Sequence, residues 1–346
     1  MKPINLYFAA VWAGQKSGEM GTLGVKNRLV SYHYPNQFPS WLEVTGNDKG
    51  NIILDSGAFS AWNKGAHIDI EDYIDFALEA IDKGSALNKT VRVVNLDVIP
   101  GKKGETRHLS TTQINAAAKE GFFNMKHMME AGITPIHVFH QGESWKWLER
   151  MVDKVPYIGI SPANDMSVPS RKQWVEGVFE YMYKNNVTAD THGFAVWVPD
   201  LLKDLPWTSC DAATWRLVSA YGGIYYPNGG FANPDFSKGS SSFSILSVSD
   251  KKGQKTRGGS KNESETLPDG FDLSYDAIPT HKGMADLLPG KLAMLAKDGY
   301  TFEDLQSWDT RAEINIRFFL AMEKWLNEYK KTHAYLPRSY RQPKIF

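Results

Sequence analysis

The stretch "NIILDSGAFSAW" (residues 51–62) joins a short apolar run to an acid, a glycine and two aromatic residues. The apolar run predicts a buried strand, and Gly57 indicates a turn directly after it. Asp55 stands at this junction, where an acid either caps the next helix or serves as a working carboxylate at the edge of a sheet. The helix cap is the simpler interpretation for one acid. A working carboxylate is favoured only if other predicted strands also end in a polar residue.

The same succession of a short apolar run and a longer amphipathic run continues along the chain. Strands are predicted in residues 1–14, 28–34, 51–55, 91–101, 133–142, 157–162, 191–197 and 207–211, and helices in residues 70–84, 111–132, 144–155 and 170–186. Apolar strands that alternate with helices are typical of a parallel sheet covered by helices. Seven or eight such units favour an α/β fold of the (β/α)8 TIM-barrel type over a doubly wound sheet, and neither a GxGxxG nor a GxxxxGK[ST] motif occurs.

Residues 227–290 interrupt this alternation and form a predicted insertion within a single domain that spans residues 1–346. The insertion is rich in Gly, Ser and Lys, which is typical of a solvated flexible loop. A group of basic residues within it favours instead an arm that binds nucleic-acid phosphates. This group comprises Lys251, Lys252, Lys255, Arg257 and Lys261. A long amphipathic helix is predicted at residues 310–331, where it would cap the barrel.

The composition excludes several classes of protein. Lys plus Arg and Asp plus Glu number 39 each, so the net charge of zero argues against a generally basic nucleic-acid coat, although not against a local basic patch. Cys210 is the sole cysteine of the sequence, which excludes intramolecular disulfides and a Cys-rich zinc site. No apolar run approaches about 20 residues, so the sequence predicts a soluble, cytoplasmic protein with no membrane partner.

Polar side chains recur at the ends of four predicted strands. Asp55 follows "NIIL", Asp97 follows "VVNL", Gln141 follows "IHVFH" and Asp211 follows "WTSC". In a parallel barrel the carboxyl ends of all strands meet on one face, where the active sites of this fold are built. A single acid would be explained as a cap, but three acids and an amide together predict a functional rim.

Three carboxylates and an amide could serve several chemistries. A Mg²⁺ site does not need the flanking aromatics, and no histidine cluster is present for zinc, so we expect no metal and no cofactor. Two carboxylates can instead act as nucleophile and general acid/base at an anomeric carbon. The remaining acid and amide could read guanine, whose N1–H and N2–H₂ donors suit a carboxylate and whose O6 suits an amide. Phe59 could stack on the flat base.

Six stretches of the sequence point to a family. They are "LDSGAFSAW", "NLDVIPG", "HVFHQGESWKWL", "YIGISP", "THGFAVW" and "SCDAATW", in this order along the chain. With these motifs the chain resembles the queuine/archaeosine tRNA-guanine transglycosylases, and more closely their phage-type relatives that act on DNA. The resemblance implies a TIM barrel that exchanges guanine in a nucleic acid for a free 7-deazaguanine base, such as 7-cyano-7-deazaguanine.

The resemblance also implies roles for individual residues. Asp211 matches the nucleophile that attacks C1′, and Asp55 matches the general acid/base. Asp97 and Gln141 match the pair that reads the base, and Phe59 matches the aromatic residue that stacks on it.

Three further positions lie in the matching motifs. Gly159 and Ser161 match a loop whose backbone approaches the base. His192 lies in "THGFAVW" and has two interpretations: a residue that positions the rim through a hydrogen bond, or a buried histidine of the core.

The chain departs from the tRNA enzymes in a way that bears on the substrate. Those enzymes carry a zinc site of three cysteines and a histidine, which a chain with one cysteine cannot form. We therefore expect DNA as the partner, with tRNA as the alternative. Two other hypotheses stay open. One is a non-catalytic barrel that binds nucleic acid or partners an active subunit, which does not need both Asp55 and Asp211. The other is a barrel glycosidase, which does not need the Asp97–Gln141 pair.

Overall fold

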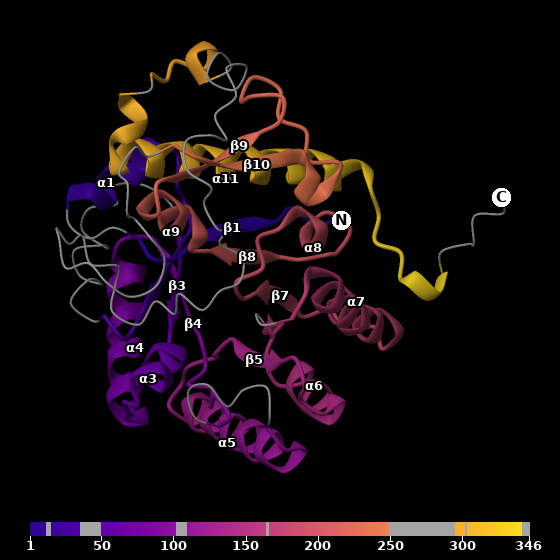
Figure 1. Ribbon diagram of the computed structural model, residues 1–346. Coiled ribbons are helices and arrows are strands. Elements are labelled where there is room, and N and C mark those ends of the chain that lie inside the picture. The colour runs from indigo at the N-terminus through magenta and orange to yellow at the C-terminus, as the bar shows by residue number, and fades with distance from the viewer. Residues whose placement is uncertain are drawn as a thin grey trace.

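The computed structural model describes residues 1–11, 15–34, 50–101, 109–163, 166–248, 295–301 and 303–340 (Figure 1). The strands are β1 (Asn5–Phe8), β2 (Arg28–Ser31), β3 (Asn51–Asp55), β4 (Thr90–Val93), β5 (His137–His140), β6 (Tyr157–Ser161), β7 (Asp190–Gly193), β8 (Ser209–Ala212), β9 (Gly223–Pro227) and β10 (Phe243–Ser247). The α-helices are α1 (Gln15–Thr22), α3 (Ala58–Lys64), α4 (Ile70–Ala86), α5 (Thr111–Glu130), α6 (Trp145–Val152), α7 (Val168–Lys184), α8 (Pro199–Leu202), α9 (Thr214–Ala220) and α11 (Trp308–Thr332). Short 3₁₀ helices are η2 (Gly239–Ser242), η4 (Asp304–Gln306) and η5 (Arg338–Tyr340).

Strands β1 to β8 form one parallel sheet in which β1 lies between β2 and β8. The two ends of this row, β4 and β5, meet at a parallel bridge between Val94 and Ile136. There the Asn95 N–H donates to Ile136 O at 2.9 Å, and the Ile136 N–H donates to Val93 O at 2.8 Å. The strands therefore follow one another around a ring, and the predicted TIM-barrel fold is confirmed.

Side chains of the barrel strands alternate between the inside of the barrel and the layer of helices, as the period of two in a strand requires. Tyr7, Leu29, Ile53, Val94 and Val138 belong to one buried cluster, which fills the inside. Their neighbours along each strand belong to a second, larger cluster that packs against the helices. This alternation determines which residues of the rim motifs face inward.

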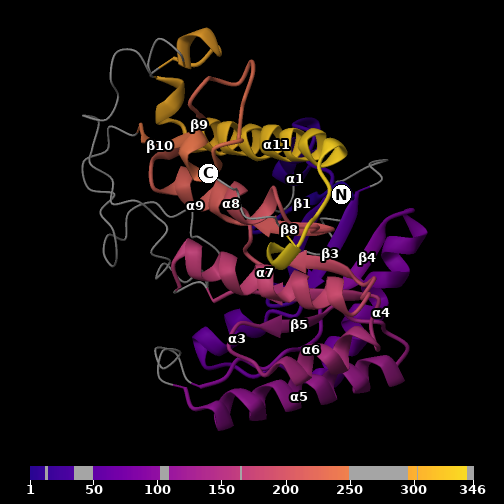
Figure 2. The same cartoon turned by 90° about the vertical axis from the view of Figure 1, so that its right-hand side faces the viewer.

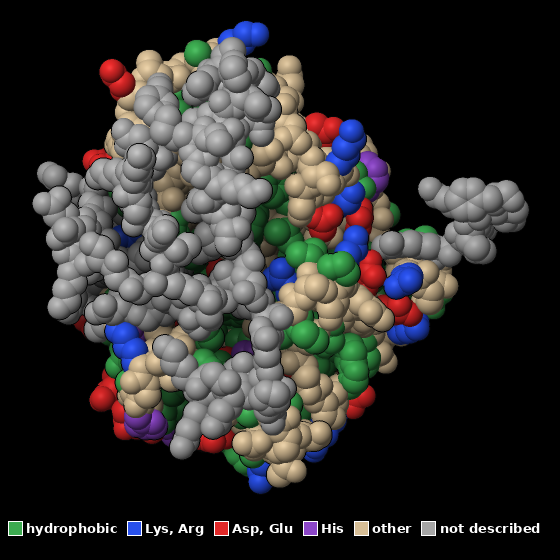
Figure 3. Space-filling model, in the orientation of Figure 1, with side chains coloured by type: hydrophobic (Ala, Val, Ile, Leu, Met, Phe, Trp, Pro, Cys, Tyr) green, Lys and Arg blue, Asp and Glu red, His purple; other side chains and the backbone are tan. Residues whose placement is uncertain are grey.

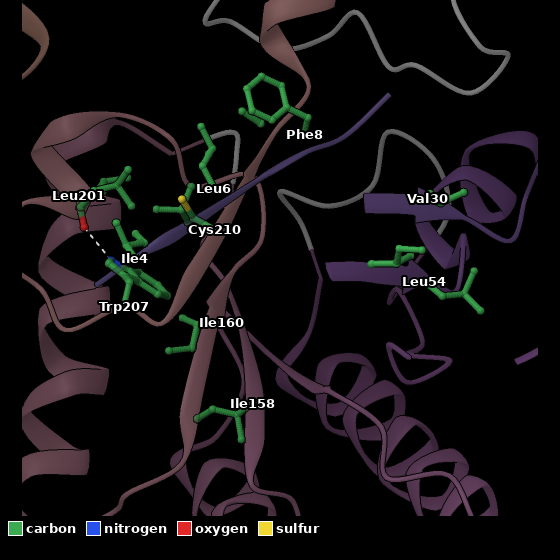
Figure 4. Packing of buried hydrophobic residues seen from close by; sticks show 14 of the residues in the cluster. Ile4, Leu6, Phe8, Val30, Leu54, Ile158, Ile160, Leu201, Trp207 and Cys210 are labelled. Carbon is green, nitrogen blue, oxygen red and sulfur yellow. Dashed lines mark hydrogen bonds between the residues drawn. The ribbon is translucent and has the colours of Figure 1, made fainter. Parts of the chain in front are cut away.

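Figure 4 shows part of the outer cluster. Cys210 lies there beside Leu6, its register partner on β1, and the indole N–H of Trp207 donates to Leu201 O at 2.8 Å. Cys210 is a free thiol and a small buried residue of this cluster. Because Cys210 faces outward, its neighbours Ser209 and Asp211 face the inside of the barrel.

Local sequence signals fix where several helices begin. Asp69 caps α4, since its side chain accepts hydrogen bonds from the backbone N–H groups of Glu71 and Asp72. Ser110 and Gln113 form a capping box at the start of α5. These bonds satisfy N–H groups that have no partner within their own helix. The helices predicted at residues 70–84, 111–132, 144–155 and 170–186 are present, with differences only at their ends.

The chain after the barrel forms an antiparallel hairpin and a long helix. β9 pairs with β10, and α11 packs against α9, β9 and β1. In both ribbon views α11 crosses the molecule beside the hairpin, on the side opposite α5 (Figures 1 and 2). The helix predicted at residues 310–331 is thus present, and it completes the outer layer over β1.

Side chains of α11 also complete the hydrogen bonding of β1, which pairs with β8 over four residues but with β2 at only one. Glu323 Oε1 accepts the N–H of Leu6, and Asn327 Oδ1 accepts the N–H of Ile4, both at 2.7 Å. Asn327 Nδ2 in turn donates to Ile4 O at 3.0 Å. Buried backbone groups without partners cost free energy, so α11 takes the place of the missing strand pairing.

Several segments differ from the sequence prediction, among them the strand expected at residues 191–197, which ends at Gly193. The strand expected at residues 28–34 ends at Ser31, because the Tyr34 N–H turns back to donate to Ser31 O at 3.0 Å. The strand expected at residues 91–101 ends at the bridge of Val94, and the remainder forms a loop of the rim. The predicted insertion at residues 227–290 contains β10, which pairs with β9, in its described part.

The bridge between β4 and β5 should open more readily than the β2–β3 ladder of the barrel wall. Two backbone hydrogen bonds join these strands, whereas β2 and β3 pair over four residues. Local opening follows the number of bonds that must break. We expect the amides of Asn95 and Ile136 to exchange with solvent at least about 10-fold faster than those of the β2–β3 ladder, measured by native-state hydrogen exchange. Equal protection in both ladders would contradict this.

Candidate active site

The four polar groups predicted for the rim lie on or just beyond four strands of the barrel. Asp55 is the last residue of β3 and Asp211 lies in β8, whereas Asp97 and Gln141 follow β4 and β5. In addition to burial, the negative charges of Asp97 and Asp211 both raise the pKa of Asp55. The structure thus brings the three acids close enough to act on one another.

Asp55 does not cap a helix. α3 begins after Gly57, which is its N-cap without a side-chain capping bond. The Gly57 N–H instead donates to Asp55 Oδ2 at 3.0 Å. Gly57 has a φ of 76°, and a Cβ on it would lie 2.9 Å from the backbone nitrogen of His33, so the turn requires glycine. This tight turn fixes Asp55 at the inner edge of the rim.

Burial raises the pKa of Asp55 from its ordinary 3.8 to about 7, and the charges of Asp97 and Asp211 add to the effect. Hydrogen bonds from the Gly57 N–H and the Ser31 hydroxyl act in the opposite direction without cancelling it. A carboxyl group that titrates near neutrality can both give and take a proton at physiological pH. This is the property expected of a general acid/base.

The loop that carries Asp97 is held from two sides. The Trp62 indole N–H donates to Gly101 O at 2.7 Å, and Asn124 Nδ2 of α5 donates to Leu96 O at 2.8 Å. Trp62 belongs to the opening stretch of residues 51–62 and Gly101 to "NLDVIPG". Two of the sequence motifs are therefore joined directly, and the position of Asp97 relative to β3 is fixed.

Asp97 is paired with His140, the last residue of β5, whose Nε2 lies 2.8 Å from Asp97 Oδ2. Burial disfavours the imidazolium form, but the hydrogen bond to Asp97 and the charge of Asp97 outweigh it and raise the pKa of His140. One oxygen of Asp97 is therefore held by the His140 ring. Burial also raises the pKa of the neighbouring Glu143 to about 7. These three residues line a small cavity of about 10 Å³.

Asp211 is held by the loop that follows β7. Its Oδ1 accepts the backbone N–H of Ala195 at 2.8 Å and lies 3.4 Å from Nε2 of His192, which is fully buried inside the barrel. Ala195 has a φ of 53°, a left-handed conformation that costs free energy for a residue with a Cβ. The fold thus holds a strained residue in order to aim its N–H at Asp211. Asp211 Oδ2 accepts no hydrogen bond from the residues that the structure describes.

Gln141 faces the loop after β6. Its side-chain Oε1 accepts the backbone N–H of Ala163 at 2.9 Å, and its backbone N–H donates to Ser161 O at 3.0 Å. Ser161 and Gly159 lie within β6, so their expected placement on a loop is wrong, because β6 pairs there with β5 and β7. A Cβ on Gly159 would lie 2.6 Å from the Phe194 ring, so glycine leaves this ring its place inside the barrel.

Phe59 lies on α3 beside the rim and is 41% exposed. Its ring is stacked on that of Trp62, with centroids 5.8 Å apart and planes 30° from parallel. An exposed ring that is held by a second ring offers a flat surface of defined orientation. This arrangement suits the stacking role that the resemblance implies.

The sequence analysis missed three polar residues of the barrel: His140, Ser209 and Tyr157. All three occupy inward-facing positions, in β5, β8 and β6. Counting back by two from a rim residue gives such positions, as from Asp211 to Ser209. The same count from Ser161 gives Tyr157, whereas His140 lies directly before Gln141 and is not found in this way.

The residues predicted to bind phosphates lie outside the described residues. They are Lys251, Lys252, Lys255, Arg257 and Lys261. On the face seen in Figure 3, basic and acidic side chains are interspersed. Within the part of the chain that the structure describes, no three His, Cys, Asp or Glu side chains are arranged to hold a metal ion. No helix in that part is both long and apolar enough to cross a membrane.

Comparisons with known proteins add little to this geometry. No protein-family model matches the chain, and no curated protein matches it. One solved structure that matches is the YdjI aldolase from Escherichia coli K12, at 11% sequence identity and a TM-score of 0.29, over 63% of this chain and 78% of that chain. A likeness this distant carries no argument, so the function must be argued from the rim.

Replacing Asp55 by Asn should stabilise the protein at neutral and higher pH. Because the pKa is raised from 3.8 to about 7, the ionised carboxylate opposes folding, increasingly as the pH rises from about 4 to about 7 and constantly above. A tenfold change in proton affinity corresponds to about 1.4 kcal/mol. We therefore expect Asp55→Asn to gain on the order of 1–4 kcal/mol in free energy of unfolding at about pH 8 and almost nothing near pH 4.

Denaturant unfolding at both pH values measures this gain. The matched control is Asp82→Asn, which removes an exposed carboxylate from α4. Equal stability of Asp55→Asn and the wild type at about pH 8 would show that Asp55 titrates normally.

Proposed function

We propose that the protein is a DNA-guanine transglycosylase, which exchanges guanine in DNA for a free 7-deazaguanine through a covalent aspartyl–glycosyl intermediate. The observation that carries the proposal is the contrast between two carboxyl groups on one rim. Asp55 is half-buried and desolvation raises its pKa to about 7, whereas Asp211 has one oxygen held by a backbone N–H and the other without a described partner. The six motifs that resemble the transglycosylases support the same assignment.

The two acids would divide the reaction between them. Asp211 Oδ2 attacks C1′ of the target nucleotide and forms a C1′–O bond as the C1′–N9 bond to guanine breaks, while protonated Asp55 gives its proton to the departing base. The incoming 7-deazaguanine then returns its N9 proton to Asp55, and its N9 attacks C1′ and releases Asp211. Both steps pass through an oxocarbenium-like state.

The Asp97–His140 pair suits recognition of a guanine edge. An ionised carboxylate is a pure acceptor, and His140 occupies only one lone pair of Oδ2. Asp97 can therefore accept the N1–H and N2–H₂ donors that guanine and 7-deazaguanines share. Gln141 keeps its Oε1 on the Ala163 N–H, so its Nε2 group is directed to act as donor, which suits O6 of the base. Adenine, with an acceptor at N1, would be rejected.

DNA is the proposed substrate because the chain, with its single cysteine, cannot build the zinc site of the tRNA enzymes. Base exchange tests this directly. Purified protein is incubated with isotope-labelled guanine, or with 7-cyano-7-deazaguanine, and either duplex DNA or tRNA, and incorporation is measured by mass spectrometry of the nucleosides. We expect incorporation into DNA. Incorporation into tRNA alone would overturn the choice of substrate, and binding of DNA without any exchange would favour the non-catalytic barrel.

Asp211→Ala should lower the rate of exchange by at least about 10³-fold, since removing a nucleophile leaves only binding and electrostatic contributions. The same variant should form no covalent complex with DNA on a denaturing gel. Asp82→Asn serves as the control and should exchange at the wild-type rate. Exchange by Asp211→Ala at the wild-type rate would disprove the assignment of the nucleophile.

Asp97→Asn should lower kcat/KM for guanine by about 10- to 100-fold, because the new amide turns a donor toward donors of the base, a mismatch that costs about 1–3 kcal/mol. It should also lower the pKa of Asp55, since one of the charges that raises it is removed. Exchange kinetics and a ¹³C NMR titration of Asp55 measure the two effects. A wild type that exchanges adenine as readily as guanine would remove this role.

A further inference from the structure

A chain of buried polar side chains runs inside the barrel from β6 to the candidate nucleophile. The Tyr157 hydroxyl is hydrogen-bonded to Ser209 Oγ, and Ser209 Oγ lies 2.6 Å from Nδ1 of His192. The other ring nitrogen of His192, Nε2, lies 3.4 Å from Asp211 Oδ1. The exchange reaction described above uses only the last of these four residues.

The imidazole of His192 is fixed in orientation by its surroundings. Its ring is fully buried, and it meets the rings of Tyr7 and Phe194 edge to face, with centroids 5.7 and 4.6 Å away. Neighbours on both sides leave no room for the ring to turn over without moving an aromatic side chain. Nδ1 therefore stays on Ser209 and Nε2 stays on the side of Asp211.

The direction of the hydrogen bonds follows from the donors available. Burial raises the pKa of Tyr157 to about 12, so its hydroxyl keeps its proton and needs an acceptor. Among the described residues Ser209 Oγ is the acceptor it contacts. Ser209 then has its own proton to donate, and the free lone pair of His192 Nδ1 receives it.

This order places the ring proton of neutral His192 on Nε2. The opposite order would turn the Nε2 lone pair toward a carboxylate oxygen 3.4 Å away, which is repulsive. It would also leave the Tyr157 proton without an acceptor in the described part of the protein. The tautomer protonated at Nε2 gives the protons of Tyr157 and Ser209 an acceptor each, and it places the Nε2 proton on the side of Asp211 Oδ1, although the two atoms, 3.4 Å apart, form no hydrogen bond.

We propose that Tyr157 and Ser209 fix His192 in the tautomer protonated at Nε2, and that this N–H, 3.4 Å from Oδ1 of Asp211, supports that oxygen electrostatically beside the hydrogen bond from the Ala195 N–H. Oδ2 is left as the attacking oxygen. His192 is thereby a positioning residue, which acts through Asp211 and does not touch the substrate. The assignment of the tautomer stands on the geometry alone, whereas its effect on the attack of Asp211 rests on the proposed function.

Holding Oδ1 of Asp211 affects how Oδ2 is oriented for attack in the exchange reaction. A carboxylate that rotates freely presents either oxygen at varying angles, whereas the hydrogen bond from Ala195 and the Nε2–H group beside Oδ1 favour one orientation of the carboxylate and one direction of Oδ2. The same donors stabilise the carboxylate that leaves C1′ in the second step. Loss of this support should lower the rate of the chemical steps and leave the binding of DNA unchanged.

The tautomer can be measured without any assay of activity. ¹⁵N NMR of histidine-labelled protein distinguishes a protonated ring nitrogen from one that accepts a hydrogen bond, and the His192 signals are assigned by their absence from His192→Gln. We expect Nε2 protonated and Nδ1 accepting in the wild type, and a mixture of tautomers in Ser209→Ala. Tyr157→Phe keeps the ring and removes one oxygen, so it tests the chain even if Ser209→Ala does not fold. Tyr183→Phe, which removes an exposed hydroxyl, is the control.

Kinetics test the second half of the proposal. Ser209→Ala and Tyr157→Phe should lower kcat by about 10- to 100-fold, as the loss of orienting partners does at other sites, with KM unchanged. Ser209→Thr, which keeps the hydroxyl, should restore much of the rate. A wild type protonated at Nδ1, or a wild-type kcat in both variants, would overturn the proposal. If the wild type exchanges no base at all, the proposed function fails, whereas protonation at Nε2 would still support the tautomer.

Discussion

Three carboxylates meet at one end of the barrel, and the repulsion between them governs how this end is built. Like charges in a partly buried setting cannot all ionise without compensation. Asp55 is relieved by its proton, which it keeps up to about pH 7. His140 lies against an oxygen of Asp97, and the N–H of Ala195 donates a hydrogen bond to Asp211, so both acids have a compensating partner. Carboxyl groups with different partners also differ in the chemistry that they can perform. The arrangement that reduces the repulsion therefore also gives each acid its own role.

The rim depends on the closure of the barrel at two weak points. The β4–β5 junction has a single bridge, directly before the loop of Asp97. β1 scarcely pairs with β2, and Glu323 and Asn327 of α11 bind the backbone of β1 in its place. On its other side β1 pairs with β8, where Tyr7 lies opposite Asp211. A helix at the far end of the chain thus helps to hold the candidate nucleophile, although it contributes no side chain to the rim.

The sequence predicts the barrel and the rim acids because both follow from periodicity and from the position of strand ends. It does not predict the pairing of Asp97 with His140, since that pairing joins two strands across a bridge whose register depends on the closed barrel. The hairpin of β9 and β10 is hidden because β10 lies in a Gly- and Ser-rich segment, where tertiary packing outweighs composition. The sequence also does not predict the left-handed conformation of Ala195. Alanine rarely adopts this conformation, and here the surrounding fold imposes it.

The coupling between Asp97 and Asp55 gives the proposed exchange a means of timing. In the empty site the charge of Asp97 contributes to the raised pKa of Asp55, after burial, so Asp55 holds its proton. When a guanine edge places its N–H donors on Asp97, part of that charge is neutralised and its repulsion of Asp55 weakens. Asp55 then becomes a stronger acid at the moment when the base that must be protonated is in place. The first step leaves Asp55 ionised, and in this form it can take up the N9 proton of the incoming base, so a single carboxyl group can serve both half-reactions.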